Sequence, residues 1–185
     1  MTDPVLITPH AGRTVEAWAA ALTGTDLVLD AAGLARFPCA LLGALANGQR
    51  RACVLGLDPA QADALAAVGA GAVLDLGAPV APTMPFAGSI RGDGTVVLRL
   101  LPSALTHPGM PGDAAKGWIE HLDLVAVEID LSALPAVNSV VIAWTLQVAH
   151  QLQGVPLRIA GASRQVATQL QQLRLDRILS IAAVR

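Results

Sequence analysis

The sequence predicts an α/β protein made of two similar units, each with a mostly parallel mixed sheet and helices packed mainly on one side. Short runs of Val, Leu and Ile alternate with Ala-rich segments of helical periodicity along the chain of 185 residues, the order expected for parallel strands joined by helices. The same order of elements recurs in the second half. A composition of 54% hydrophobic and 14% charged residues indicates a folded chain with an aliphatic core.

The first predicted unit spans residues 1–77 and alternates strands with helices. We expect strands where β-branched and leucine residues form short runs, and helices where apolar residues recur at i, i+3 and i+4. Asp58 suits the N-cap of the third helix, and Pro59 suits its first helical position. In chain order, the predicted elements are strand 4–8, helix 13–23, strand 26–30, helix 39–48, strand 51–57, helix 58–71 and strand 72–76.

A Pro-rich linker is predicted at residues 78–88, because this segment contains three prolines and no charged residue. The second predicted unit, residues 89–185, opens with a hairpin, since "GDG" separates two extended runs. Its predicted elements are hairpin 89–100, loop 101–112, helix 113–122, strand 124–130, helix 139–154, strand 155–161, helix 163–175 and strand 177–183.

Corresponding positions in the two halves indicate a tandem duplication. In each half, a tryptophan lies in the first predicted helix, an aspartate ends the strand that follows this helix, and a glycine lies near the end of the next strand. The matched pairs are Trp18 with Trp118, Asp30 with Asp130 and Cys39 with Ser139 at an offset of 100, and Gly56 with Gly161 at an offset of 105. We therefore interpret the first half as a second copy of the same fold.

Charge and composition exclude several classes of function. The formal net charge of -2 and the aromatic content of 3% provide no basic surface for nucleic acid or acidic lipid, and few rings for base stacking. No apolar run reaches the roughly 18 residues of a membrane-spanning helix, and no signal peptide opens the sequence. We therefore expect a cytoplasmic protein that does not insert into the membrane.

Motifs for catalysis or cofactor binding are missing from the sequence. The four histidines lack metal-ligand spacing, the two cysteines are not in a CxxC, and neither a phosphate-binding glycine loop nor a GxSxG elbow occurs. We expect no enzymatic activity, no metal and no cofactor.

The segment "VEIDLSALPAVNSVVIAW" contains a strand ending in Asp130, a loop, and the pair Asn138-Ser139 at the start of a helix. With the closing strand, helix and strand of residues 155–183, it resembles a STAS domain, the module shared by bacterial anti-sigma factor antagonists and sulfate transporter tails. The resemblance covers about residues 89–183. It implies that Ser139 is a phosphorylation site and that Asp130 lies near it.

This chain departs from the family pattern in two places of that motif and more widely in its first half. Asn138 stands where an Asp is usual, and Val141 stands where a Gly is usual. The first half has Pro38-Cys39 at the equivalent position and lacks the opening hairpin strand. We therefore expect it to be a degenerate copy without a phosphorylation site.

Two interpretations of Asn138-Ser139 are open at this stage. Both residue types favour N-cap positions, so the pair can simply cap the helix. Alternatively, Ser139 is an exposed modification site, where a phosphate gains from free N–H groups and the helix dipole.

On the helix that follows, residues spaced i, i+4, i+7 and i+11 form a stripe that we interpret either as a partner-binding surface together with Asn138 or as a packing surface against the first unit. The stripe consists of Val140, Trp144, Gln147 and Gln151.

These observations predict a non-catalytic regulatory protein that binds a protein partner through the helix starting at Ser139. The resemblance implies an antagonist that binds an anti-sigma kinase-like protein. A second hypothesis is an accessory subunit that contacts the ATPase of an ABC-type lipid transporter. A third is a pseudo-dimer that binds a small molecule or nucleotide between its units. Homo-oligomer formation is compatible with each of them.

Overall fold

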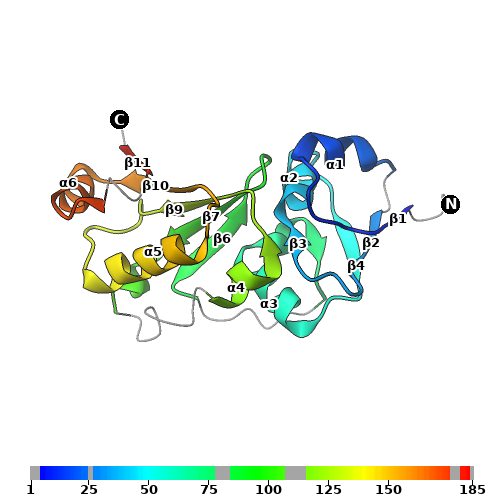
Figure 1. Ribbon diagram of the computed structural model, residues 1–185, viewed down its shortest axis with the longest axis horizontal. Coiled ribbons are helices and arrows are strands. Elements are labelled where there is room, and N and C mark those ends of the chain that lie inside the picture. Colours follow the sequence, from blue (N-terminus) through cyan, green and yellow to red (C-terminus); the bar gives the residue numbers. More distant parts are fainter. Residues whose placement is uncertain (1–4, 25–26, 78–83, 107–115, 176–179, 184–185) are drawn as a thin grey trace.

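The computed structural model describes residues 5–24, 27–77, 84–106, 116–175 and 180–183. Its helices and strands form two α/β halves that lie side by side along the long axis of the molecule (Figure 1). The predicted fold class is confirmed, with one correction. The sheet of the first half is entirely parallel, and only the second sheet is mixed.

The first half contains a four-stranded sheet with the strand order β1-β2-β4-β5. Its third helix begins as expected, because the Asp58 side chain accepts a hydrogen bond of 2.8 Å from the Gln61 N–H and Pro59 is the first helical residue. The elements are β1 (Val5–Ile7), α1 (Val15–Ala21), β2 (Leu27–Asp30), β3 (Phe37–Pro38), α2 (Cys39–Asn47), β4 (Ala52–Leu55), α3 (Pro59–Ala67), the 3-10 helix η1 (Ala70–Ala72) and β5 (Leu74–Asp75).

The second half contains a five-stranded sheet with the order β11-β10-β9-β7-β6. The hairpin β6–β7 is antiparallel, as the "GDG" turn predicts, and the other neighbours are parallel. The elements are β6 (Phe86–Ile90), β7 (Thr95–Leu100), the 3-10 helix η2 (Pro102–Leu105), α4 (Lys116–His121), β8 (Leu122–Asp123), β9 (Ala126–Asp130), α5 (Ser139–Gln151), β10 (Leu157–Ala162), α6 (Arg164–Gln172) and β11 (Ser180–Ala183).

The two sheets have the same strand order apart from one extra strand. Read from one edge, β5-β4-β2-β1 of the first half corresponds to β11-β10-β9-β7 of the second, where β6 then follows as an additional edge strand. In chain order, α2 follows β2 and the short strand β3 in the first half, and α5 follows the corresponding strand β9 in the second half. This shared topology agrees with the interpretation of the first half as a copy, which stays a prediction.

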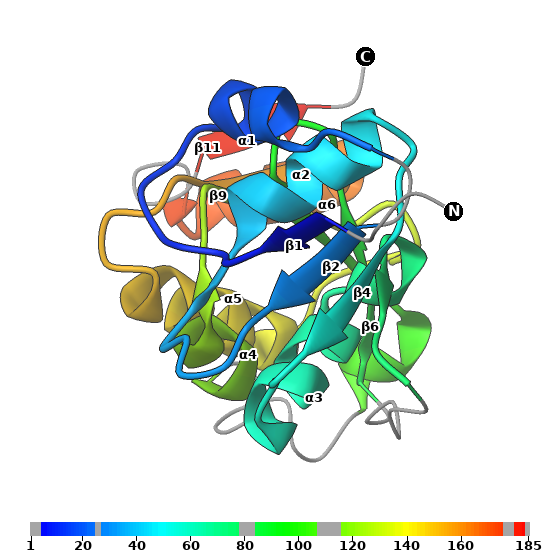
Figure 2. The ribbon, with the colours of Figure 1, turned by 90° about the vertical axis from the view of Figure 1, so that its right-hand side faces the viewer.

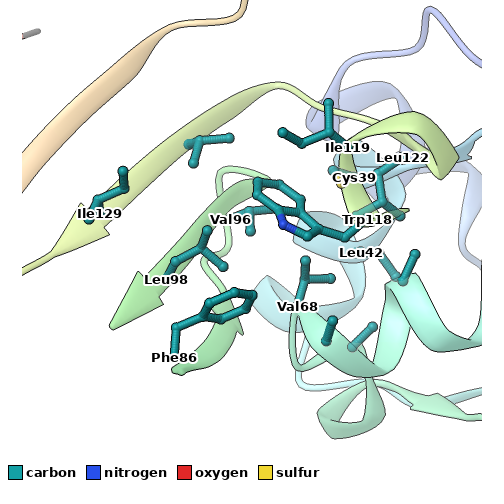
Figure 3. Packing of buried hydrophobic residues seen from close by; sticks show 14 of the residues in the cluster. Cys39, Leu42, Val68, Phe86, Val96, Leu98, Trp118, Ile119, Leu122 and Ile129 are labelled. Atoms are coloured by element: carbon teal, nitrogen blue, oxygen red, sulfur yellow. The ribbon is translucent and has the colours of Figure 1, made fainter. Parts of the chain in front are cut away.

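One hydrophobic core runs through both halves. Cys39 and Leu42 of α2 lie against Trp118 of α4 and Val96 of β7, all buried, at the centre of the molecule (Figure 3). The helix α2 is buried from Cys39 to Leu45 because it lies between its own sheet and the hairpin β6–β7. Small residues permit this approach, since a Cβ added to Gly43 would lie 2.6 Å from the Gly94 Cα.

Two features between the halves differ from the predicted boundaries. The strand β6 begins at Phe86, inside the segment predicted to be a linker, whose residues 78–83 lie outside the described residues. In addition, β3 and β8 form a short parallel pair that joins the two halves, with Phe37 opposite Leu122. Neither of these two-residue strands was predicted from the sequence.

Candidate functional site

The connection from β9 to α5 places Asn138 and Ser139 at the start of a helix of 13 residues. Asn138 is the N-cap, and its Oδ1 accepts a hydrogen bond of 3.1 Å from the Val141 N–H. Its Nδ2 donates a bond of 2.8 Å to the carbonyl oxygen of Leu105 in η2. The capping interpretation is therefore confirmed for Asn138, which also ties η2 to the start of α5.

Ser139 is the first residue of α5, and its side chain is exposed. The helix geometry leaves the first backbone N–H groups without intrahelical partners, and Asn138 satisfies only that of Val141. The first turn carries no acidic residue. Ser139 thus presents a hydroxyl to solvent at the positive end of a helix dipole.

The interpretation of the stripe as a partner-binding surface is wrong for Trp144, because its side chain is 0% exposed. The packing alternative is correct for this residue, although its ring contact lies in the second half and not in the first unit. The indole packs on Phe86 of β6, with ring centroids 5.8 Å apart. The buried side of α5 also includes the Thr145 side chain, whose hydroxyl donates a bond of 2.9 Å to the Val141 carbonyl. The spacing i, i+3, i+4, i+7 and i+11 could have revealed this inward face, which consists of Val141, Trp144, Thr145, Val148 and Leu152.

The outward side of α5 is therefore a different stripe from the predicted one. Ser139, Ala143 and His150 are exposed, and Gln147 between them is half-buried. Val140 and Gln151, which the sequence analysis placed at the binding surface, are also half-buried and flank this stripe.

Asp130 ends β9, and its carboxylate has partners other than Ser139. It accepts bonds of 2.9 Å from the Arg99 Nε and from the Ser132 N–H. Burial alone would raise the pKa of Asp130, but the bonds from Arg99 and Ser132 hold this pKa below its usual value. Gly161, with a φ of +68°, packs over this turn, and a Cβ there would lie 2.8 Å from the Ser132 nitrogen.

A second ion pair lies on the same strand, two residues earlier. The Glu128 side chain is 4% exposed and accepts bonds from two arginines. Arg91 contacts it at 2.5 and 2.9 Å, and Arg158 is the other partner. Because side chains alternate between the faces of a strand, Glu128 and Asp130 point to the side of the sheet opposite Ile129. This cluster was not predicted from the sequence, although single charges inside the apolar strands signal it.

The equivalent position in the first half has none of the features of Ser139. There, Pro38 precedes α2 without a side-chain cap, and Cys39 is 0% exposed. Burial, and secondarily the nearby Asp123 carboxylate, raises the pKa of the Cys39 thiol to about 12. The turn after the strand is nevertheless repeated, because the Asp30 carboxylate accepts from the Ala32 N–H as Asp130 does from Ser132.

A cavity of about 250 Å³ lies where the two halves meet between α3 and α4. Its wall is mostly apolar, and Trp118 forms part of it. The lining residues are Ala60, Asp63, Ala64, Ala67, Met84, Gly117, Trp118 and His121. It is one of the places between the halves that the small-molecule hypothesis requires, and its titratable lining residues are Asp63 and His121.

The second half thus combines a mixed sheet with a capped helix that begins at an exposed serine. The family model of the STAS domain matches residues 88–184, slightly more than half of the chain. The chain therefore belongs to the STAS domain family. Searches of curated proteins and of solved structures gave no significant match. Within the described part of the chain, every helix is too short or too polar to cross a bilayer.

Proposed function

We propose that this STAS protein is a cytoplasmic, non-catalytic regulator that binds a partner protein at the start of α5, and that phosphorylation of Ser139 releases the partner. The observation that carries the proposal is the exposure of Ser139 at the first position of α5, within the part of the chain that matches the family. The resemblance to anti-sigma factor antagonists implies a kinase-like partner.

Electrostatics supports a switch at this position. A phosphoserine carries a charge of about -1.5 to -2 at neutral pH, and the helix N-terminus stabilises it through free N–H groups and the dipole. The phosphorylated free protein is therefore stable. A partner surface that covers Ser139 and Ala143 would have to remove water from this charge, which disfavours the complex.

The contact surface follows from the outward stripe of α5. Ser139, Ala143, Gln147 and His150 succeed one another at helical spacing. Ala143 permits close approach, and the polar side chains around it provide a rim of the kind found at transient interfaces. Trp144 contributes by fixing the helix on the sheet and not by contact.

The test is capture of the partner from an extract of cells that express the protein naturally. We expect wild type and Ser139→Ala to retain the same protein and Ser139→Asp to lose it. Ser163→Asp is the matched control, because Ser163 is an exposed N-cap of α6 where Asp caps equally well. Equal capture by Ser139→Asp and wild type would refute the switch.

An accessory subunit of an ABC-type lipid transporter is the second candidate function. The contacts of Asn138 favour it, because the amide donates to the Leu105 carbonyl and so fixes the site in one conformation. A constitutive subunit needs such a fixed surface and no phosphate. Under this alternative, the captured protein is a transporter ATPase, and Ser139→Asp retains it.

A further inference from the structure

No helix of the described part of the chain covers the outer face of the first sheet, and this face is largely apolar. Figure 2 looks onto this face and shows β1, β2 and β4 in front, with no helix drawn across them. The strand register and the alternation of burial define its residues, because Leu27, Leu29 and Ala52 point inward to the core. The outer face consists of Leu6, Val28, Asp30, Cys53, Leu55 and Asp75.

This exposure is unusual for a parallel sheet. Parallel sheets are almost always covered on both faces, but here Leu6 is 63% exposed and Leu55 is 51% exposed. They are two of the four large apolar side chains that stand out as exposed among the described residues. The corresponding side of the second sheet differs, because Glu128 and Asp130 there are engaged with arginines. A contiguous apolar area of this kind marks an interaction surface.

We propose that a second copy of this chain covers the outer face of the first sheet, forming a two-fold symmetric dimer. The distribution of charge along the strands makes the face self-complementary. Arg51, which is exposed, precedes β4 at the N-terminal end of the strands, and Asp30 ends β2 at the opposite end. The apolar residues lie between these two charges.

A two-fold axis that lies between two such faces, perpendicular to the strands, reverses the strand direction. Arg51 of one copy then lies over the strand ends that carry Asp30 in the other copy. The row of Leu6, Val28 and Cys53 lies along the axis, so each apolar residue meets its own counterpart. Asp75 continues this row on the edge strand β5, so the two Asp75 side chains face each other at the rim, where water separates them.

Cys53 reports on this arrangement directly. Sheets packed face to face are about 10 Å apart, which is too far for a disulfide but within the reach of a short bismaleimide. Cys39 does not interfere in the folded protein, because it is fully buried and its pKa is raised to about 12 by that burial. A covalent dimer through Cys53 is therefore expected only if the two faces meet.

The test combines sedimentation equilibrium with this cross-linking on the full chain. We expect the apparent mass of wild type to double within a concentration series up to about 1 mM, and bismaleimide to produce a covalent dimer that Cys53→Ser abolishes. Leu6→Asp should restore the monomer mass and lose the cross-link, because it brings two carboxylates together on the axis. Leu173→Asp is the control, because Leu173 is 54% exposed on the second half, and it should behave as wild type.

Three results would overturn the proposal. They are a wild-type monomer throughout the series, a dimer that Leu6→Asp leaves intact, or a dimer in which Cys53 does not cross-link. The cross-link in wild type needs no substitution, so it decides the question even if an aspartate variant fails to fold. A different protein bound to this face, with wild type itself monomeric, would also overturn it.

Discussion

Replacing Gly43 by Ala tests the contact between the two halves with a single methyl group. Gly43 lies in the middle of α2, where the helix meets the turn of the hairpin β6–β7. An added Cβ would lie 2.6 Å from the Gly94 Cα and 3.1 Å from the Gly92 carbonyl oxygen. Both neighbours are backbone atoms, so neither can rotate away as a side chain would.

The expected effect is the difference between two opposing terms. Ordinary carbon contacts are about 3.5–4.0 Å, so α2 and the hairpin must separate by roughly 1 Å. Overpacking of this kind costs about 1–3 kcal/mol or more, and a rigid backbone contact favours the upper end. Ala gains about 1 kcal/mol over Gly in a helix. The net loss of stability is therefore about 2 kcal/mol, which lowers Tm by about 4–8 °C for a chain of this size.

Urea unfolding followed by far-UV circular dichroism measures this free energy. Gly117→Ala is the matched control, because Gly117 is an exposed helical residue of α4 with no atom within 4 Å of an added Cβ. It should be neutral or stabilising by up to about 1 kcal/mol. A Gly43→Ala variant at least as stable as wild type would contradict the close packing of the two halves.

Two further predictions concern the candidate site. Asn138→Asp restores the residue usual in the family and keeps a capping oxygen, but it loses the donor to the η2 carbonyl, so urea unfolding should show a loss of about 1–2 kcal/mol; unchanged stability would contradict the role of the amide. Asp130→Asn should lose roughly 0.5–1 kcal/mol at pH 7, because it loses an ion pair whose arginine is exposed. Since the pKa of Asp130 is lowered in the folded state, its contribution is present above the unfolded pKa and lost as the pH falls through the folded one, so the difference from wild type should narrow below about pH 4. Asp30→Asn keeps the acceptor for its turn and loses no described ion pair, so it should lose less stability at pH 7 than Asp130→Asn. An equal loss in both variants would contradict the ion-pair explanation.

Most elements of the fold could be predicted because each is a local property of the sequence. Hydrophobic periodicity located the helices and most strands. Asp58 caps a helix by accepting a hydrogen bond from a nearby residue, and the "GDG" turn joins two adjacent strands, so both signals are local. The pair β3–β8 could not be predicted, because each strand has two residues and the partners come from different halves. The start of β6 was not predicted, because the prolines before Phe86 are typical of a linker.

The position of the candidate site could be predicted from the sequence, but the orientation of its helix could not. The resemblance placed Ser139 at a helix start, and the structure has it exposed there. The predicted rotation of α5 about its axis was wrong, because the helical spacing of Trp144 with Gln147 and Gln151 suggested a surface stripe. Burial depends on what lies opposite, and Phe86 on the distant strand β6 provides the partner that the helix sequence does not reveal.

The extra strand β6 explains why the two halves differ at the same helix. It pairs with β7, and together the two strands cover α2, whose small residues Gly43 and Ala44 let the hairpin approach. Among the described residues, the first half has no such hairpin, and no equivalent element covers the outward stripe of α5. Cys39 therefore lies in the core, while Ser139 meets solvent. Of these two helix starts, only that of α5 is accessible, so the proposed binding of a partner and the proposed phosphorylation both depend on this one copy.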